Sequence, residues 1–505
     1  MKKQGQRKLK KREGEILERL ANDHEVRLSP MMDATNVMYE VSGRTDATAW
    51  GGVAAMYQLA CTVGLVASLD EKVHVLKIHK PYHESDHIMS IALNALAGGT
   101  CLEDLELRRK DQAFMNALGA ERIPDPTTAG DFTRRFADEA AVLNLMEAIN
   151  AVRPGIWSEL PAKERRKAVI DTDGTLAPTT GERKEGMGLS YKGVWSYHPL
   201  VVSLANTREA LYLVNRPGNS VSHEGAAAYM DRAVALVRGS FQKVWLRGDT
   251  DFSLTTHFDR WTTERVNFVF GFDAMPNLVE IADGLEEKRW KPLVRRAKHV
   301  CQGKRRRGRA NVKEGIVKEK GYKNIRLQSE EVAEFSYRPS KCARDYRVVV
   351  VRKNVSVEKG EAVLFDDIRY FFYITNDTTM SARQVVRFIN GRCDHENDIE
   401  QLKNGINAMR MPSGDLYSNG AYMVMAALAW NLKAWYGILM PNKTMGGQVV
   451  RMEFARFLNG FMALPTHVLK QARQIKLRVL AWTPYLEAFL EMFTWIRTRR
   501  FAYRL

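Results

Sequence analysis

The sequence has few cysteines, and their arrangement excludes two common kinds of framework. Only five occur among 505 residues. Their number is odd, they are scattered along the chain, and no two are spaced Cys-x-x-Cys, so neither a disulfide framework nor a zinc module is expected. The five are Cys61, Cys101, Cys301, Cys342 and Cys393.

The chain also lacks an apolar run long enough for a membrane span, which needs about 18 uninterrupted residues. The closest candidate, residues 421–440, is interrupted by Asn431 and Lys433 and is typical of a buried amphipathic helix. The amino terminus is rich in lysine and arginine but has no apolar segment like that of a signal peptide. We therefore expect no export, no membrane partner and a cytoplasmic location.

Basic residues outnumber acidic ones. The sequence has 76 Lys and Arg against 59 Asp and Glu, a net charge of +17 and a pI near 9.5. This balance favours a polyanionic partner, because binding to phosphates releases condensed counterions; a basic protein with no such partner is the alternative. The 45% hydrophobic and 27% charged residues are ordinary globular values, which excludes a disordered or collagen-like chain.

A basic arm and a helical region come first. Seven of the first 12 residues are Lys or Arg, typical of a solvated arm that can clamp phosphates near nucleic acid. Apolar residues then recur at spacings of three and four, which predicts helices over about residues 50–160. Pro124 and Pro126 interrupt this region, and Thr127 or Thr128 is expected to cap the next helix. Residues 1–165 therefore form the first predicted unit.

An α/β pattern follows over residues 166–284, which form the first part of a predicted core. Alternating or β-branched runs predict strands, and one helix is predicted near residues 224–237. The predicted strands cover residues 167–173, 195–203, 210–215, 243–246 and 266–270. Three further segments complete the chain. We expect a β-rich insertion at 285–366, a helical second part of the same core at 367–440, and a basic helical region at 441–505.

Acidic residues stand at the ends of two predicted strands. Asp171 and Asp173 share one face of the strand at 167–173. The run VWLRGDTDF (residues 244–252) ends a second apolar strand at Asp249, with Asp251 two residues on. Aspartates at such positions also act as simple turn formers, because their side chains accept hydrogen bonds from nearby backbone N–H groups. Either site alone is therefore equally consistent with a structural role.

A third acidic position lies on a predicted helix at residues 391–404. Arg392, Glu396 and Lys403 are spaced by four and seven residues and so share one face. Charged side chains on an otherwise apolar face are unfavourable to bury, because they lose their hydration, unless an ion pair or a bound ion compensates that loss. The alternative is a solvent-facing helix with ion pairs between successive turns. Oxygen-only ligand sets suit Mg²⁺ or Mn²⁺, and two such ions stabilise displacement at phosphorus.

The ensemble resembles the DDE transposases of bacterial insertion sequences. The segment IDTDGT (170–175) looks like that family's first element and assigns Asp173 as a metal ligand, with Asp171 as a rival. The segment RGDTDF (247–252) looks like the second and assigns Asp249. The spacing of Arg392, Glu396 and Lys403 matches the Tyr-Arg-Glu-Lys signature and assigns Glu396, although Ile389 stands at the tyrosine. The intervals are 76 residues (173 to 249) and 147 residues (249 to 396), and the second leaves room for an insertion.

The resemblance implies a fold and an activity. The fold would be α/β, an RNase H-like mixed sheet with a β-rich insertion, preceded by an all-helical domain that binds DNA ends. Asp173, Asp249 and Glu396 would hold two Mg²⁺ or Mn²⁺ ions. The enzyme would nick transposon ends and join them to target DNA by transesterification. Its partners would be double-stranded DNA, with terminal inverted repeats and target, and a second copy in a synaptic homodimer associated with the nucleoid.

Several basic residues are expected to contact that DNA. They are Arg392, Lys403, Arg247, Lys304, Arg305, Arg306 and Arg307. Two alternatives to a transposase stay open: a metal-dependent nuclease on the same core that cuts without joining, and a catalytically silent, domesticated DNA-binding protein. The histidines His83 and His87, four residues apart, are compatible with a metal, but without a His-Glu-x-x-His frame a zinc protease is not expected.

Overall fold

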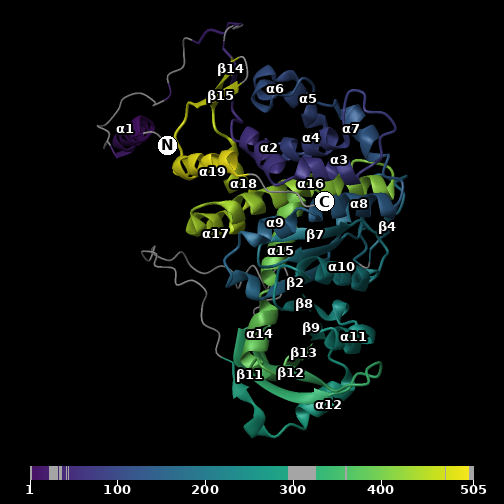
Figure 1. The fold of residues 1–505 in the computed structure, drawn as a ribbon. Helices are drawn as coiled ribbons and strands as arrows, with labels where there is room; N and C mark the ends of the chain where they lie inside the picture. The colour runs from purple at the N-terminus through teal and green to yellow at the C-terminus, as the bar shows by residue number, and fades with distance from the viewer. Residues whose placement is uncertain are drawn as a thin grey trace.

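A computed structural model shows the fold (Figure 1). A nine-stranded mixed sheet forms its centre, in the order β10-β11-β12-β13-β9-β8-β2-β6-β7. The described residues are 3–21, 32, 37–40, 43, 45–190, 192–293, 326–358, 361–471 and 474–499. The core strands are β2 (Ala168–Gly174), β6 (Leu200–Leu204), β7 (Glu209–Val214), β8 (Val244–Gly248) and β9 (Val266–Phe272).

The three middle strands β2, β8 and β9 run parallel, and β6 and β7 add antiparallel strands beside β2. All five residues of β8 are buried, as expected for a strand covered on both faces. The helix α10 (Ala226–Arg238) packs on β2, β6 and β8. The predicted strands and this helix are therefore present, with ends shifted by a few residues.

One predicted strand is divided in two. Residues 195–203 form β5 (Trp195–Tyr197) and β6, with a break at His198 and Pro199. Proline has no backbone N–H to donate to a neighbouring strand, so a continuous strand is disfavoured there. β5 instead joins the small sheet β3-β5-β4, with β3 at Ala177–Pro178 and β4 at Gly188–Leu189.

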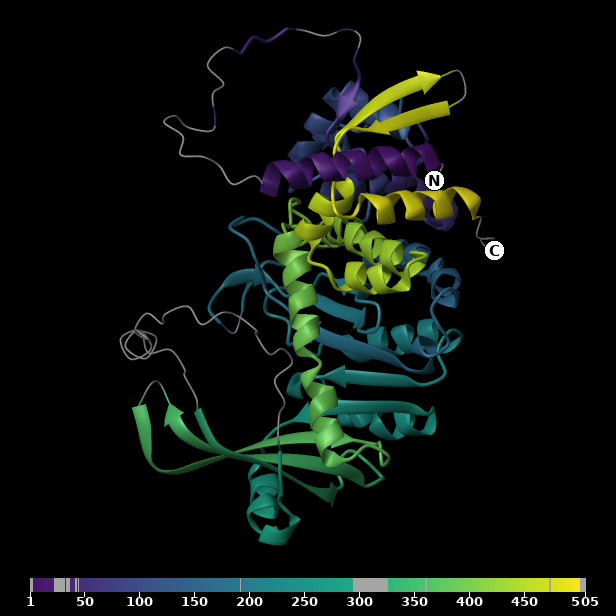
Figure 2. The ribbon, with the colours of Figure 1, turned by 90° about the vertical axis from the view of Figure 1, so that its left-hand side faces the viewer.

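The β-rich insertion extends the central sheet. Its meander consists of β11 (Arg326–Tyr337), β12 (Tyr346–Glu358) and β13 (Glu361–Thr375), with the short β10 (Lys291–Pro292) at its outer edge. β13 pairs antiparallel with β9, Phe372 opposite Phe272. The strands were expected, but they continue to Thr375, past the predicted boundary at 366. Figure 2 shows the long meander strands at one end of the sheet.

A helical column crosses the molecule from the meander toward the amino-terminal helices (Figure 2). It consists of α14 (Ala382–Asn390), α15 (Cys393–Glu400) and a π-helical turn, η6 (Gln401–Gly405). The side chain of Ser381 caps α14 by accepting a hydrogen bond from Gln384 N. α14 packs on β9, β11 and β12, and the column therefore brings α15 to the carboxyl ends of the parallel strands.

The amino-terminal helical region is confirmed and shares a core with the sheet. Its helices are α2 (Val53–Thr62), α3 (Leu65–Lys72), α4 (Glu84–Leu96), α5 (Leu105–Lys110), α6 (Gln112–Leu118), α7 (Pro126–Thr133), α8 (Glu139–Asn150) and α9 (Arg153–Ser158). The cap of α7 is Asp125, not a threonine, and its side chain accepts from Thr128 N. Aspartate before a proline at the first helical position is a strong start signal.

The long helix α16 (Leu416–Leu439) joins the two parts. It packs on α4 and α8 on one side and on β7 on another. The helix is buried, as predicted, but it is not amphipathic, because α16 is buried on every face, including Lys433. Within the described residues no single helix has the length and hydropathy of a membrane span, although the bent pair α2 and α3 has them in combination.

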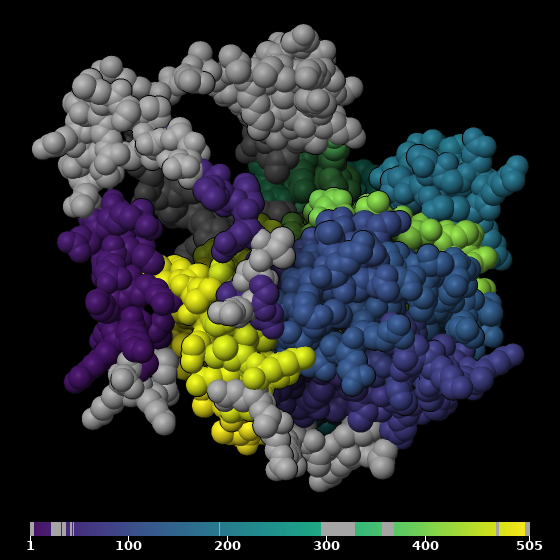
Figure 3. Space-filling view, turned by 90° about the horizontal axis from the view of Figure 1, so that it is seen from above, coloured from purple at the N-terminus to yellow at the C-terminus, as the bar shows by residue number. Residues whose placement is uncertain are grey.

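The carboxyl-terminal region is only partly helical. α17 (Lys443–Arg451), α18 (Phe454–Phe457) and α19 (Leu486–Thr498) agree with the prediction. Between them, β14 (Thr466–Gln471) and β15 (Gln474–Val479) form a hairpin. Val468 and Leu477, one on each strand, pack on α6, which anchors the hairpin. The amino-terminal helix α1 (Lys3–Ala21) lies beside this region (Figure 3), and Arg12 donates to the carbonyls of Val479 and Leu480.

Candidate active site

Two of the predicted acids lie at the ends of neighbouring parallel strands. Asp173 is the penultimate residue of β2, and Asp249 directly follows β8. Asp171 is opposite Arg247 in the register of these strands, so both carboxyl ends reach the same edge of the sheet. Asp249 also caps a short 3₁₀ turn, accepting from the backbone N–H of Asp251.

Arg392, at the start of α15, brings the three predicted acids together. Its Nη1 lies 2.8 Å from Asp173 Oδ2 and 3.4 Å from Asp249 Oδ2. Its Nη2 lies 3.0 Å from Glu396 Oε1, one helical turn further on. Three carboxylates from two strands and one helix thus converge on a single guanidinium, which is the shared location that the family resemblance implied for them.

Burial raises the pKa values of two carboxylates in this cluster. The pKa of Asp173 is raised to about 7, mainly by burial; Arg392 opposes the shift, while Asp249 and Glu396 add to it. Burial likewise raises the pKa of Asp249. Three carboxylates cannot all ionise at close range without positive charge between them. Nearby positive charge therefore stabilises the ionised cluster, and Arg392 supplies one such charge.

The donor set suits a hard divalent cation. All three ligand candidates offer carboxylate oxygens, the donors that Mg²⁺ and Mn²⁺ prefer, and the side chain of Glu396 is 52% exposed and so reachable from solvent. As the side chains are placed, no group of three acidic, histidine or cysteine residues in the described chain would itself hold a metal ion. The guanidinium of Arg392 stands among the carboxylates, so ligation requires it to shift.

Asp171 and Arg247 form a separate, buried pair, which corrects two predictions. Arg247 Nε and Nη2 donate to the two oxygens of Asp171 at 2.5 and 2.6 Å. The two residues are 1% and 5% exposed, and Arg247 Nη1 donates to Phe388 O at 2.7 Å. Asp171 therefore does not face the cluster around Arg392, and Arg247 does not present its guanidinium to DNA. Alternation along β2 did not distinguish Asp171 from Asp173.

Lys403 lies beyond the cluster on the π-helical turn η6. Its Nζ donates to Leu176 O at 2.7 Å and to Thr175 Oγ1 at 3.4 Å. Burial lowers the pKa of Lys403. The lysine thus ties the helical column to the loop that follows β2, two residues past Asp173. π-helical turns interrupt α-helices most often at functional sites.

The opposite face of α15 is fixed by contacts that the sequence did not reveal. His395 Nδ1 lies 2.8 Å from Ser203 Oγ on β6, and Arg208 donates to Asp398 at 3.1 Å. Both side chains of α15 are buried. At Gly391 an added Cβ would lie 2.3 Å from Arg247 Nη1. A larger residue at this position would push against the guanidinium of Arg247. A glycine between two helices was therefore the sequence feature that could have indicated a close contact here.

Several predicted contacts cannot be placed. Lys304, Arg305, Arg306 and Arg307 lie outside the described residues. Ile389, at the position of the signature tyrosine, is 6% exposed and packs with Val385 and Val386. Its side chain therefore serves the core between α14 and the sheet.

The family follows from a comparison of the whole sequence. Residues 29–500 match the model of a family described as transposase DDE domain group 1. The chain belongs to this transposase family. The resemblance to DDE transposases drawn from three short motifs is confirmed, and the structure has the predicted mixed α/β sheet with a helical amino-terminal region. The transposase is an enzyme that cleaves DNA and joins strands by transesterification.

Comparisons with curated proteins and with solved structures give weaker similarity or none. No curated protein matches the transposase. A solved structure to which it is similar is the cryo-EM structure of a piggyBac transposase synaptic complex with hairpin DNA. The two share 10% sequence identity at a TM-score of 0.39, over 80% of this chain and 81% of that one.

Proposed function

We propose that Asp173, Asp249 and Glu396 are the catalytic residues and hold two divalent cations, Mg²⁺ or Mn²⁺. The observation that carries this proposal is the convergence of the three carboxylates on Arg392, each within 3.4 Å of its guanidinium. Bound cations would supply the positive charge that activates the attacking oxygen and stabilises the leaving one.

Arg392 and Lys403 are proposed to bind phosphates of the DNA. The side chain of Arg392 is 24% exposed at the mouth of the cluster, and a guanidinium binds phosphate through paired hydrogen bonds. Lys403 already holds the loop after β2 through Leu176 O, so a phosphate contact there would also order the segment next to Asp173. Both residues would act by positioning the phosphate and compensating its charge.

The proposed substrate is double-stranded DNA: the terminal inverted repeats of an insertion sequence and a target duplex. The net charge of +17 supports a polyanionic partner. We further propose that two copies pair in the synaptic complex and that the transposase works in the cytoplasm, on the nucleoid.

The test is a cleavage and joining assay with Asp249→Asn. Purified transposase, DNA carrying the element's ends, a target plasmid and Mg²⁺ or Mn²⁺ should yield 3′-hydroxyl ends joined to the plasmid. The variant should bind the same DNA but cut it at least about 1,000-fold more slowly, a loss of about 4 kcal/mol in the transition state. Calorimetric titration with Mn²⁺ should show lost binding.

The matched control is Asp251→Asn, which removes a carboxylate two residues away that makes no contact with Arg392. This control should cleave like the wild type. Normal cleavage by Asp249→Asn would remove Asp249 from the site. Cut ends that are never joined would favour the nuclease.

A further inference from the structure

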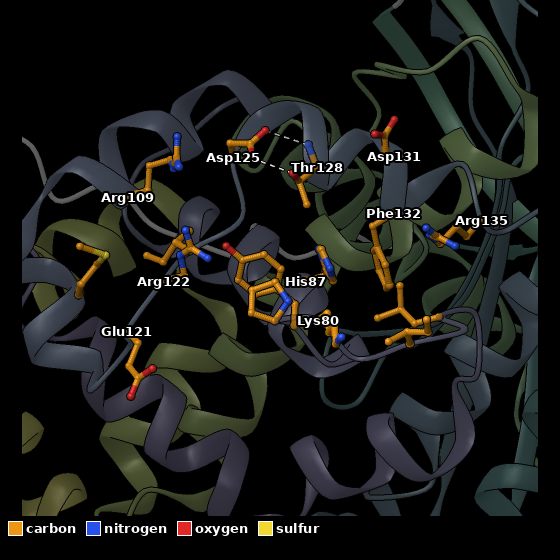
Figure 4. A pocket seen from close by; sticks show the side chains of 16 residues that line it. Lys80, His87, Arg109, Glu121, Arg122, Asp125, Thr128, Asp131, Phe132 and Arg135 are labelled. Carbon is orange, nitrogen blue, oxygen red and sulfur yellow. Dashed lines mark hydrogen bonds between the residues drawn. The ribbon is translucent and has the colours of Figure 1, made fainter.

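A cavity of about 560 Å³ opens in the amino-terminal helical domain, apart from the carboxylate cluster. Its walls come from the loop before α4, from α4 itself, from the end of α5 and from the segment between α6 and α7. Figure 4 shows Arg109 and Arg122 on one side, Phe132 and Arg135 on the other, and His87 between them. Its size is that of a site for a small organic ligand.

More basic than acidic side chains at the rim of the cavity are without a partner among the described residues. Arg122, Arg135 and Lys80 line the cavity, and their side chains make no hydrogen bond or ion pair with any residue that the structure describes. Two of the three acids are already engaged. Asp125 accepts from Thr128 N at 3.0 Å and caps α7, and Asp131 pairs with Arg134 outside the cavity.

His87 adds a buried polar group in the wall. Its ring stacks on Phe132 at 4.3 Å and is 4% exposed. Nδ1 has no hydrogen-bond partner among the described residues. An unsatisfied buried polar atom costs about 1–3 kcal/mol. Burial lowers the pKa of His87 to about 4, so the ring is neutral at pH 7 and has one N–H to donate.

A second cavity of about 280 Å³ adjoins the first and shares Tyr82 and Arg122 with it. Its walls are more apolar and include Met89, Leu93 and Phe114. The two spaces together offer a cationic compartment next to an apolar one. A ligand with an anionic end and a less polar organic part matches both.

We propose that the larger cavity binds the phosphate of a nucleotide unit. Arg122 and Arg135 would hold the phosphate oxygens, with Lys80 adding charge and His87 donating a hydrogen bond. Guanidinium groups that are not already paired are the preferred partners of phosphate. Tyr82, between the two compartments, would contact the sugar or base. The phosphate comes either from the DNA backbone or from a free nucleotide, and the experiment separates these sources.

The experiment titrates the full chain with deoxyadenosine 5′-monophosphate and with deoxyadenosine, by calorimetry. A duplex of random sequence is titrated in parallel at several salt concentrations, by fluorescence anisotropy. The variant is Arg122→Gln with Arg135→Gln. The control is Lys72→Gln with Lys77→Gln, which removes two exposed charges from the same domain outside the cavity.

We expect the nucleotide to bind saturably and the nucleoside not to bind. The arginine variant should weaken nucleotide binding at least tenfold, and the lysine control less than about twofold. If the arginine variant also weakens duplex binding and lowers its salt slope by about one to two units beyond the control, the phosphate belongs to DNA. Unchanged duplex binding with lost nucleotide binding identifies a free nucleotide.

The proposal is overturned if the arginine variant and the lysine control behave alike with both ligands. It is also overturned if nucleotide and nucleoside bind equally and duplex binding is unchanged. Neither result depends on catalysis, so a failure here leaves the assignment of Asp173, Asp249 and Glu396 to be judged by its own assay.

Discussion

Arg392 Nη1 donates a hydrogen bond of 2.8 Å to Asp173 Oδ2, across 219 residues of sequence. Without bound cations, this arginine is the counterion of the acidic cluster. The same side chain is the one proposed to bind phosphate. Its two roles compete in one conformation, because three of the five N–H donors of the guanidinium face the carboxylates and only two are left for DNA.

The first prediction concerns this counterion. Arg392→Gln should lower the free energy of unfolding by about 1–3 kcal/mol in the absence of divalent cations, because the carboxylates then repel one another. Mn²⁺ should raise the thermal midpoint of the variant more than that of the wild type. Differential scanning fluorimetry with and without the ion measures both effects.

The control for this prediction is Arg387→Gln. Arg387 is exposed on α14, and its side chain makes no hydrogen bond or ion pair with the described residues. Its replacement should leave both midpoints unchanged. An Arg392 variant as stable as the wild type without cations would show that the cluster does not depend on this residue.

The second prediction separates Asp171 from Asp173. Asp171→Asn leaves Arg247 buried without its carboxylate and should cost about 3–5 kcal/mol of unfolding free energy. Asp173→Asn should instead stabilise the cation-free protein at pH 8, by about 1 kcal/mol or more. The folded-state pKa of Asp173, about 7, is raised above the usual value of 3.8. Its ionisation therefore disfavours folding increasingly as the pH rises from about 4 to 7.

Urea denaturation at pH 8 without divalent cations measures this contrast. Calorimetry with Mn²⁺ completes it, since only Asp173→Asn should lose metal binding while folded. If Asp171→Asn were neutral, or if it abolished Mn²⁺ binding without loss of stability, Asp171 would take the place of Asp173 as the ligand.

The third prediction concerns His87. Its pKa in the folded protein is about 4, below the usual value of 6.5. As the pH falls below 6.5, His87 is protonated in the unfolded chain but stays neutral in the folded protein. The free energy of unfolding therefore decreases between about pH 6.5 and 4. His87→Phe should remove about 2 kcal/mol of the difference in unfolding free energy between pH 8 and pH 5.

The control for the histidine is His74→Gln. His74 is exposed and makes no hydrogen bond with the described residues. This variant should keep the pH dependence of the wild type in urea denaturation. An equal dependence in His87→Phe would mean that His87 is protonated as readily as a histidine in solution.

Local patterns predicted much of the fold. Alternation and β-branched residues marked β2, β8 and β9, and helical spacing marked α15 with Arg392 and Glu396 on one face. These signals depend on neighbours in sequence, and they survive in the structure because the local preferences and the tertiary contacts agree. The order of three motifs along the chain was enough to predict the family.

Features that depend on distant partners were missed. The pairing of β13 with β9 joins the insertion to the core sheet. The sequence of neither strand indicates which strand it pairs with. The hairpin β14–β15 alternates correctly but lies in a region whose basic composition suggested helix. The bidentate pair of Asp171 and Arg247 depends on the register of β2 with β8, which composition does not encode.

The burial of α16 on all sides has a mechanical consequence. The amino-terminal helices α4 and α8 and the core strand β7 all pack on this one helix, and a single hydrophobic cluster runs from Val53 to Ile496 through it. The amino-terminal helices and the sheet therefore share one main hydrophobic core. Because this core is close-packed across α16, a displacement of the amino-terminal helices would be passed to the sheet through directly packed side chains.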